Sequence, residues 1–233
     1  VLSEYARVMS KGKKAILIRE GDSLVGVELT DGNSQILVAN RHGRAVRFDE
    51  NELRAMGRVS SGVRGMKIDE DSEDAVVGLV VMPENSDTTV LVLSQKGFGK
   101  RSQLDGYRLT RRGARGVKTM NITEKTGELI AFKSVNDDND LMIINKSGVV
   151  IRVHVSDIRV MGRATQGVRI INLEKRNDTI ASVCCVEADP EEETEQIAPD
   201  AEELPALTDS ETESEEDVTD DEIAEEEATE ENE

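Results

Sequence analysis

The chain has 233 residues, of which 33% are charged, 37% apolar and 2% aromatic, and its formal net charge is -19. This length fits one domain of ordinary size, or one domain followed by a tail. No apolar run approaches the ~18 residues that a membrane-spanning helix needs, which excludes a membrane protein. Residues 187–233 hold 24 of the 48 acidic residues and no Lys or Arg, so residues 1–186 carry 24 acidic and 29 basic residues. The acidity therefore belongs to a tail, and the remainder is mildly basic.

Two short apolar segments open the chain, KKAILI (residues 13–18) and GDSLVGVELT (residues 21–30), and each predicts a strand. They correspond to the end of a unit that recurs later in the chain. The first residues include no initiator Met and no hydrophobic signal-peptide core. We therefore expect this sequence to be the interior of a longer protein.

The next part of the chain is a repeat, because residues 36–68, 90–122 and 141–173 align without gaps. Two glycine positions recur at separations of 54 and 51 residues, namely Gly43, Gly97, Gly148 and Gly62, Gly116, Gly167. An acidic residue and a short apolar stretch follow each copy, which gives a unit of four short strands in about 52 residues. Units of four strands that repeat near 50 residues are typical of the blades of a β-propeller.

The sequence thus predicts an all-β fold of four-stranded propeller blades. Three blades are too few for a closed propeller, which usually has roughly 4–8, so the chain is expected to be part of a larger wheel. We expect the C-terminal half of an incomplete blade in residues 1–35, complete blades in 36–83, 89–136 and 140–186, and a disordered acidic tail in 187–233.

Four positions of the repeat are basic in all three copies, and the second copy adds two further arginines. The candidate DNA-binding residues are Arg47, Arg54, Arg58, Arg64, Arg101, Arg108, Arg111, Arg112, Arg115, Lys118, Arg152, Arg159, Arg163 and Arg169. Cations at the same place on every blade form a rim that suits the phosphates of a polyanion. Duplex DNA is favoured over a single strand, which needs more aromatic stacking partners than this chain has. The alternative is that each arginine pairs with a carboxylate inside its own blade.

We find no residues that suggest an active site or a metal site. Tyr5 and Tyr107 align with Leu53 and Ile158, which favours packing in the core over chemistry. Cys184 and Cys185 are adjacent, and neighbours on a strand point to opposite faces, so a disulfide between them is not expected. The chain has only two histidines, and their spacing suits no zinc site. A reducing, cytoplasmic location fits these features.

The segments RAMGRVSSGVRGMKI (54–68), QKGFGKRSQLDGYRLTRRGARGVKTM (95–120) and SGVVIRVHVSDIRVMGRATQGVRII (147–171) resemble blades of the C-terminal domain of bacterial DNA gyrase A, a β-pinwheel. The resemblance implies that residues 1–186 bind and wrap duplex DNA to support ATP-dependent negative supercoiling by a type II topoisomerase. It also implies that this chain holds no active site and no cofactor, and that ATP and Mg²⁺ act elsewhere in an A2B2 assembly with gyrase B. The segment most similar to the family's gyrase box, Thr110–Gly116, departs from it at the first and fifth places and resembles an ordinary blade loop.

Two alternatives remain open at this point. The corresponding C-terminal domain of topoisomerase IV resembles this chain too, although its blades are more degenerate. A propeller that binds proteins, with its arginines used internally, is the alternative from a different class.

The tail generates the first testable prediction. Deleting residues 187–233 removes 24 acidic residues that compete with DNA for a basic surface, so duplex affinity should increase, most clearly at low salt. A salt series of binding titrations on the two proteins measures this. Equal affinities at every salt concentration would show that the tail is only a solvated extension.

Overall fold

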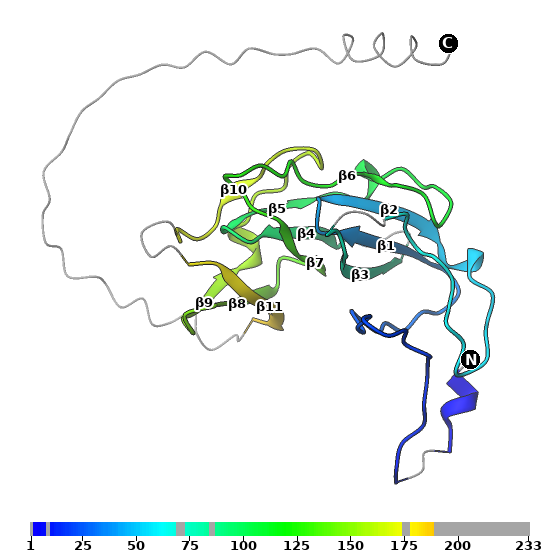
Figure 1. Ribbon diagram of the computed structural model, residues 1–233. Coiled ribbons are helices and arrows are strands. Elements are labelled where there is room, and N and C mark those ends of the chain that lie inside the picture. Colours follow the sequence, from blue (N-terminus) through cyan, green and yellow to red (C-terminus); the bar gives the residue numbers. More distant parts are fainter. Residues whose placement is uncertain (1, 8–9, 69–72, 84–86, 174–177, 189–233) are drawn as a thin grey trace, which may run out of the picture. The chain divides into compact units, whose positions relative to one another are not determined.

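In the computed structural model, residues 2–7, 10–68, 73–83, 87–173 and 178–188 are described, and they form antiparallel β-sheets (Figure 1). The strands are β1 (Ser34–Asn40), β2 (Arg44–Asp49), β3 (Val76–Pro83), β4 (Thr89–Ser94), β5 (Phe98–Ser102), β6 (Val117–Lys118), β7 (Leu129–Val135), β8 (Asn139–Asn145), β9 (Val150–His154), β10 (Val168–Arg169) and β11 (Ile180–Glu187). Single 3-10 turns lie at Leu2–Tyr5, Glu50–Glu52, Leu104–Gly106 and Val155–Asp157. The predicted all-β fold is confirmed, and no described helix is long and apolar enough to cross a membrane.

The sheets exchange strands between successive repeats. The strand orders are β3-β1-β2-β6, β10-β5-β4-β7 and β11-β8-β9. Strand β6 belongs to the second repeat but pairs with β2 of the first, and β10 of the third repeat pairs with β5 of the second. Each four-stranded sheet therefore takes its fourth strand from the repeat that follows, and the third sheet has three strands among the described residues. The spacing of a repeat cannot reveal this exchange, because it does not say which sheet a strand joins.

The core lies between successive sheets. Side chains alternate along a strand, so the run Val90-Leu91-Val92-Leu93 of β4 packs on both of its faces. Val90 and Val92 join Leu37, Val80 and Met82 of the first sheet in one cluster, whereas Leu91 and Leu93 join Leu141 and Ile143 of the third sheet in another. The middle sheet is thus covered on both sides. A third cluster, which includes Ile36, Val38 and Phe48, lies on the outer face of the first sheet.

The second glycine position of the repeat, which holds Gly62, Gly116 and Gly167, lies in the long loops. In two of the three copies the backbone of this glycine lies very close to a strand of the preceding sheet. Gly116 and Gly167 have positive φ angles of 78° and 83°. A Cβ atom at Gly116 would overlap the carbonyl group of Ala45 on β2, and a Cβ at Gly167 would come within 2.7 Å of the Gly99 oxygen on β5. Gly62 has the same backbone conformation, with φ 76°, but no atom lies within 4 Å of its Cβ position. In the second and third copies, this glycine therefore lets the loop pack against the sheet before it.

The two strands predicted within residues 13–30 do not form, and this prediction is wrong. The described residues 10–33 contain no strand, and Ile16, Leu17 and Ile18 are 45–46% exposed. A strand needs a neighbour to satisfy its backbone N–H and C=O groups, and the described residues provide no hairpin for this segment. Even so, Leu17 N donates to Ser60 O at 3.1 Å, the same contact that Lys67 N makes with Ala114 O at 2.9 Å one repeat later. Of the predicted disordered tail, residues 189–233 lie outside the described residues.

The two glycine environments give a matched pair of variants. Gly62→Ala places a side chain in open space, so we expect only the cost of the left-handed backbone, about 1–2 kcal/mol. Gly116→Ala adds a clash with β2, and we expect a total loss of about 3 kcal/mol or more. Urea denaturation of both variants and the unchanged chain measures the difference. Equal losses would mean that the contact between Gly116 and β2 does not limit the packing.

Candidate nucleic-acid interface

Three long loops carry most of the basic positions of the repeat. They comprise residues 53–66, 107–120 and 158–171, and we call them the loop band. Together they contain eleven Lys and Arg residues and no Asp or Glu. In Figure 1, the loops that hold β6 and β10 run along the same edge of the sheets. The side-chain charges of the band itself are therefore all of one sign, although two carboxylates from outside it contact the band, Glu52 at Arg112 N and Glu4 at Arg58.

Hydrogen bonds join the loops in series. Asn121 N, just after the second loop, donates to Thr165 O in the third at 3.2 Å, which repeats the contact between Lys67 and Ala114. Two side chains of the band add equivalent links. Arg112 Nη1 donates to Arg64 O at 3.1 Å, and Arg163 Nη1 donates to Lys118 O at 2.9 Å. The structure thus brings the predicted cations of the three loops onto one connected surface.

Most of these cations are exposed. Arg112 and Arg163 are half-buried by the links just described, and the other nine are exposed to solvent. The exposed residues are Arg54, Arg58, Arg64, Arg108, Arg111, Arg115, Lys118, Arg159 and Arg169. The position of Arg54, Arg108 and Arg159 is exposed in every loop. Arg58 lies 3.7 Å from Glu4, an exposed pair that contributes little binding energy and can be displaced by a phosphate.

The remaining basic position of the repeat lies on the strands, away from the loop band. Arg101 is 6% exposed, and its Nε donates to Ile158 O at 2.8 Å. Arg47 Nη1 donates to Leu104 O at 2.8 Å and to Tyr107 O at 2.7 Å. Both guanidinium groups hold the base of the following loop, so they are not available to a phosphate. The alternative of pairing with a carboxylate inside the same blade does not describe these contacts, which reach carbonyl oxygens of the following repeat, although Arg101 also pairs with Asp137.

Arg152, the third residue at that position, pairs inside its own sheet. Its Nε donates to the fully buried carboxylate of Asp140 at 2.6 Å, and His154 Nδ1 lies 2.6 Å from the other carboxylate oxygen. Burial alone would raise the pKa of Asp140, but the hydrogen bonds from Arg152 and His154 outweigh it and lower that pKa. Arg152 therefore contributes to the sheet and does not join the eleven residues of the band.

Lys100 supports the third loop and was missed by the sequence analysis. Its side chain is fully buried, and Nζ donates to Gly162 O at 2.6 Å, Arg163 O at 2.5 Å and Thr165 Oγ1 at 3.0 Å. The aligned residues of the other copies are Val46 and Ile151, so the repeat pattern carried no signal for a cation here. Burial, with a smaller contribution from the charge of Arg163, lowers the pKa of Lys100 to about 8.

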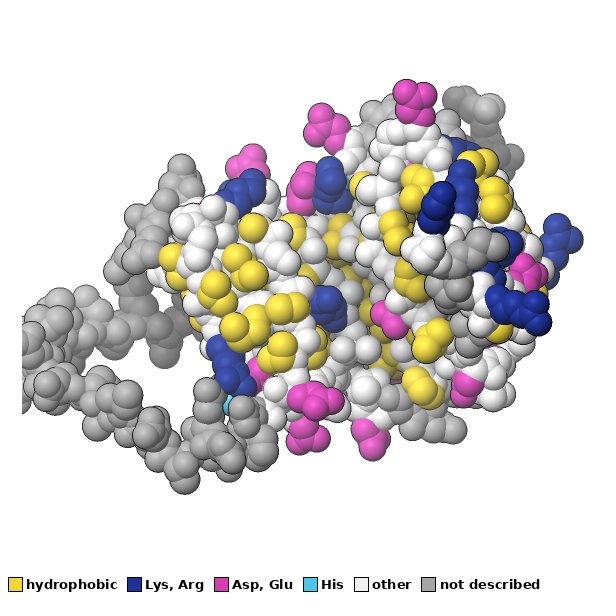
Figure 2. Space-filling view, turned by 90° about the horizontal axis from the view of Figure 1, so that it is seen from below, with side chains coloured by type: hydrophobic (Ala, Val, Ile, Leu, Met, Phe, Trp, Pro, Cys, Tyr) yellow, Lys and Arg dark blue, Asp and Glu magenta, His cyan; other side chains and the backbone are white. Residues whose placement is uncertain are grey.

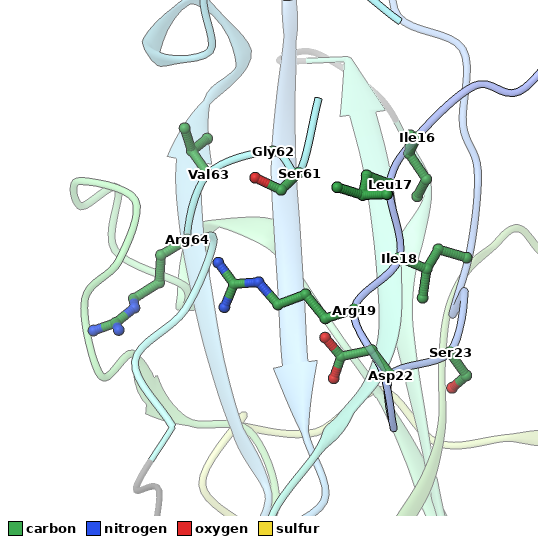
Figure 3. A pocket seen from close by; sticks show the side chains of 10 residues that line it. All are labelled: Ile16, Leu17, Ile18, Arg19, Asp22, Ser23, Ser61, Gly62, Val63 and Arg64. Carbon is green, nitrogen blue, oxygen red and sulfur yellow. The ribbon is translucent and has the colours of Figure 1, made fainter. Parts of the chain in front are cut away.

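An open pocket lies where the band meets the N-terminal segment. It has a volume of about 500 Å³ and lies between residues 16–23 and residues 61–64. In Figure 3, Arg19 reaches across this pocket toward residues 61–64, whereas Arg64 points away from it. Arg19 is a further cation beside the band. Figure 2 shows the face of the molecule below the sheets of Figure 1, where basic and acidic side chains are mixed among hydrophobic ones.

Tyr107 has a structural role. Tyr107 is fully buried and its hydroxyl lies 2.5 Å from Thr119 Oγ1, which confirms the prediction that it packs in the core. Cys184 and Cys185 are both free thiols on β11. Within the described part of the chain, no cluster of three or more His, Cys, Asp or Glu is suited to a metal ion.

The sequence matches a known protein family over most of its length. The model described as "DNA gyrase C-terminal domain, beta-propeller" matches residues 4–31, 34–81, 88–136 and 139–186. The chain belongs to this gyrase C-terminal domain family. DNA gyrase A of Staphylococcus aureus (strain NCTC 8325 / PS 47) is 43% identical over 193 residues, which cover 83% of this chain and 21% of the relative. The same protein of strain MRSA252 is 43% identical over 194 residues, which cover 83% of this chain and 22% of the relative.

Two solved structures share the fold of this chain. The C-terminal domain of DNA topoisomerase IV has a TM-score of 0.72 at 25% identity, covering 79% of this chain and 57% of that one. The DNA gyrase A C-terminal domain has a TM-score of 0.65 at 24% identity, and the match covers 75% of this chain and 58% of that one. The predicted resemblance and the propeller fold are confirmed. This gyrase domain spans about a fifth of the length of the curated relatives it matches.

Lys100 gives a prediction about the stability of this gyrase domain. Its pKa of about 8 in the folded state is below the ordinary value of 10.5, so between these values the unfolded chain binds more protons. The free energy of unfolding then rises with pH in this window through this group. We expect the unchanged chain to gain stability relative to the Lys100→Met variant from pH 8 to pH 10.5. Urea denaturation at several pH values tests this, and a constant difference would contradict it.

Proposed function

We propose that this gyrase C-terminal domain binds duplex DNA on the loop band and wraps it across successive sheets. The observation that carries the proposal is that three connected loops present eleven cations and no carboxylate. Cations on phosphates release condensed counterions, which gives strong affinity without reading sequence. A strip of one sign across several repeats suits a long polyanion better than it suits a compact ligand.

Duplex is the favoured form of the nucleic acid. The band lacks a helix that could enter a major groove, and its one aromatic residue, Tyr107, is fully buried. Stacking of unpaired bases therefore has no exposed aromatic partner on these loops. Contacts to the sugar–phosphate backbone remain, and these set position and orientation but carry no direct sequence information.

We further propose the setting in which this domain acts. It is the DNA-binding part of a gyrase A protein, whose remaining length and gyrase B complete a cytoplasmic A2B2 type II topoisomerase that introduces negative supercoils. ATP hydrolysis and Mg²⁺ belong to those other parts, and this chain contributes no catalytic residue or cofactor. Topoisomerase IV is the second candidate, because its C-terminal domain has the higher TM-score of 0.72. The 43% identity to gyrase A over 83% of the chain favours gyrase.

The exposed arginine that recurs in every loop gives the direct test. The triple variant Arg54→Ala, Arg108→Ala, Arg159→Ala removes three cations whose side chains are exposed. If each contacts a phosphate, the slope of log affinity against log salt should fall by about 3, and duplex affinity at low salt by about tenfold or more. Fluorescence titration of a duplex of about 30 base pairs measures both. An unchanged slope would refute the placement of DNA on the band.

A control variant that loses the same number of positive charges outside the loops distinguishes an effect of the loop band from an effect of the protein's total charge. The variant Lys96→Ala, Lys125→Ala, Lys146→Ala removes three exposed lysines that lie outside the loops. Its slope should change much less than that of the arginine variant. Urea denaturation of both variants ensures that neither effect comes from unfolding.

A further inference from the structure

Residues 5–18 come before the first loop of the band and repeat several of its features. A 3-10 turn at Leu2–Tyr5 leads into this segment, as the other three 3-10 turns lead into the three loops of the band. Gly12 has a φ angle of 72°, close to the angles of 76° to 83° at the second recurring glycine of the loops. We call residues 5–18 the N-terminal loop.

Two backbone hydrogen bonds join the N-terminal loop to the first loop of the band. Leu17 N donates to Ser60 O at 3.1 Å, and Val59 N donates to Ala15 O at 3.0 Å. Figure 3 shows residues 16–18 on the opposite side of the open pocket from the first loop. The two loops therefore lie next to each other and are paired through their backbones.

The first and second loops of the band are paired at the equivalent places. Lys67 N donates to Ala114 O at 2.9 Å, and Gly113 N donates to Gly65 O at 2.6 Å. Each of these four residues is as many places from its recurring glycine as its counterpart in the preceding pair, where Gly12 takes the place of that glycine. The N-terminal loop thus lies beside the first loop in the way that the first loop lies beside the second.

Val59 keeps this geometry although its side chain disfavours it. Its φ angle is 67°, and it is the one non-glycine residue with a positive φ among the described residues. Gly113, at the equivalent place in the second loop, has a φ of 78°. A left-handed backbone is unfavourable for a β-branched residue. The hydrogen bond to Ala15 therefore forms in a conformation that only the second loop fills with glycine.

The N-terminal loop carries the same sign of charge as the band. It contains four Lys and Arg residues and no Asp or Glu, and all four are exposed: Arg7, Lys11, Lys13 and Lys14. Lys14 lies two places after Gly12, where the three loops of the band have Arg64, Lys118 and Arg169. This position of the repeat is therefore basic in four successive loops.

One acidic residue, Glu4, lies directly before the N-terminal loop. Its backbone oxygen accepts a hydrogen bond from Lys13 Nζ at 3.2 Å, and its carboxylate lies 3.7 Å from Arg58 of the first loop. Both contacts are exposed, so they contribute little energy and leave Lys14 outside them.

We infer that the N-terminal loop is a fourth part of the DNA-binding surface and that Lys14 contacts a backbone phosphate of the duplex that crosses the band. The inference rests on the proposed function and extends the length of duplex that one chain holds. A duplex that follows loops paired in series meets the N-terminal loop next, because the same hydrogen bonds continue the series. Lysine supplies a compact charge that binds a phosphate without reading sequence.

Protection of lysine side chains from acetylation tests the inference on the unchanged chain. The chain is treated with acetic anhydride at low salt, with and without a duplex of about 30 base pairs, and mass spectrometry measures the modification of each lysine. Acetylation of Lys14 and of Lys118, which hold the same place in their loops, should fall to a similar extent. Three exposed lysines outside the loops should keep their reactivity, namely Lys96, Lys125 and Lys146.

The pattern of protection separates the inference from the proposed function. Protection of Lys118 without Lys14 would overturn the inference and leave DNA on the band. A duplex that binds and protects neither lysine, or a duplex that does not bind, would refute the proposed function itself. Equal protection of the lysines outside the loops would also overturn the inference, because the duplex would then have no defined path.

A matched pair of variants measures the contribution of Lys14 to affinity. Lys14→Ala and Lys118→Ala each remove one exposed cation from the same position of the repeat. If each lysine contacts a phosphate, the slope of log affinity against log salt should fall by about 1 in each variant. The exposed Lys125→Ala variant is the control and should keep the slope of the unchanged chain. An unchanged slope for Lys14→Ala would overturn the inference, whatever the result for Lys118→Ala.

Discussion

The arrangement depends on one recurring constraint: each repeat must hydrogen-bond its loop to the sheet that precedes it. Strand β6 completes the first sheet and β10 completes the second, so neither four-stranded sheet forms from a single repeat. The guanidinium groups of Arg47 and Arg101 strengthen the same connection by binding loop carbonyls of the following repeat. The loops therefore lie in series because of the sheets, and a connected basic strip follows from backbone pairing before any charge is considered.

This constraint also explains how eleven cations can lie close together. Like charges on one strip repel each other, and the repulsion weakens folding unless other interactions fix the loops. The sheets supply those interactions through backbone hydrogen bonds and buried apolar faces, so the arginine side chains at positions 54, 108 and 159 can remain exposed. The sheets thus supply most of the stability of the loops, and Arg112 and Arg163 of the band add links between them. A polyanion that binds the band as proposed would meet loops whose backbone is already fixed, so that only the exposed side chains remain to be ordered on binding.

The sequence predicted the repeat unit, the all-β fold and most of the basic surface. The glycines, apolar stretches and basic residues that indicate them recur at fixed separations. It could not separate Arg47 and Arg101 from Arg54 and Arg108, since a pattern of charge does not show burial. It also could not show that β6 and β10 join neighbouring sheets. Lys100 was missed because it replaces Val46 and Ile151, and repeat alignment detects only what the copies share. The predicted strands near Leu17 failed because strand formation depends on a partner as well as on local propensity.

Residues that differ between the copies therefore indicate contacts that the common pattern of the repeat does not show. A residue that recurs, such as Gly116 or Arg101, is explained by a contact that its counterparts also make. A residue that appears once requires a local reason, because the other copies fold without it. For Lys100 the reason is three acceptors in the following loop, so its charge is used inside the protein. Arg44 is another residue that appears in one copy only, and its Nη1 donates to Gly116 O in the following loop at 3.3 Å. A cation that appears in one copy only can therefore stabilise the connection between repeats, and the pattern common to the copies does not reveal it.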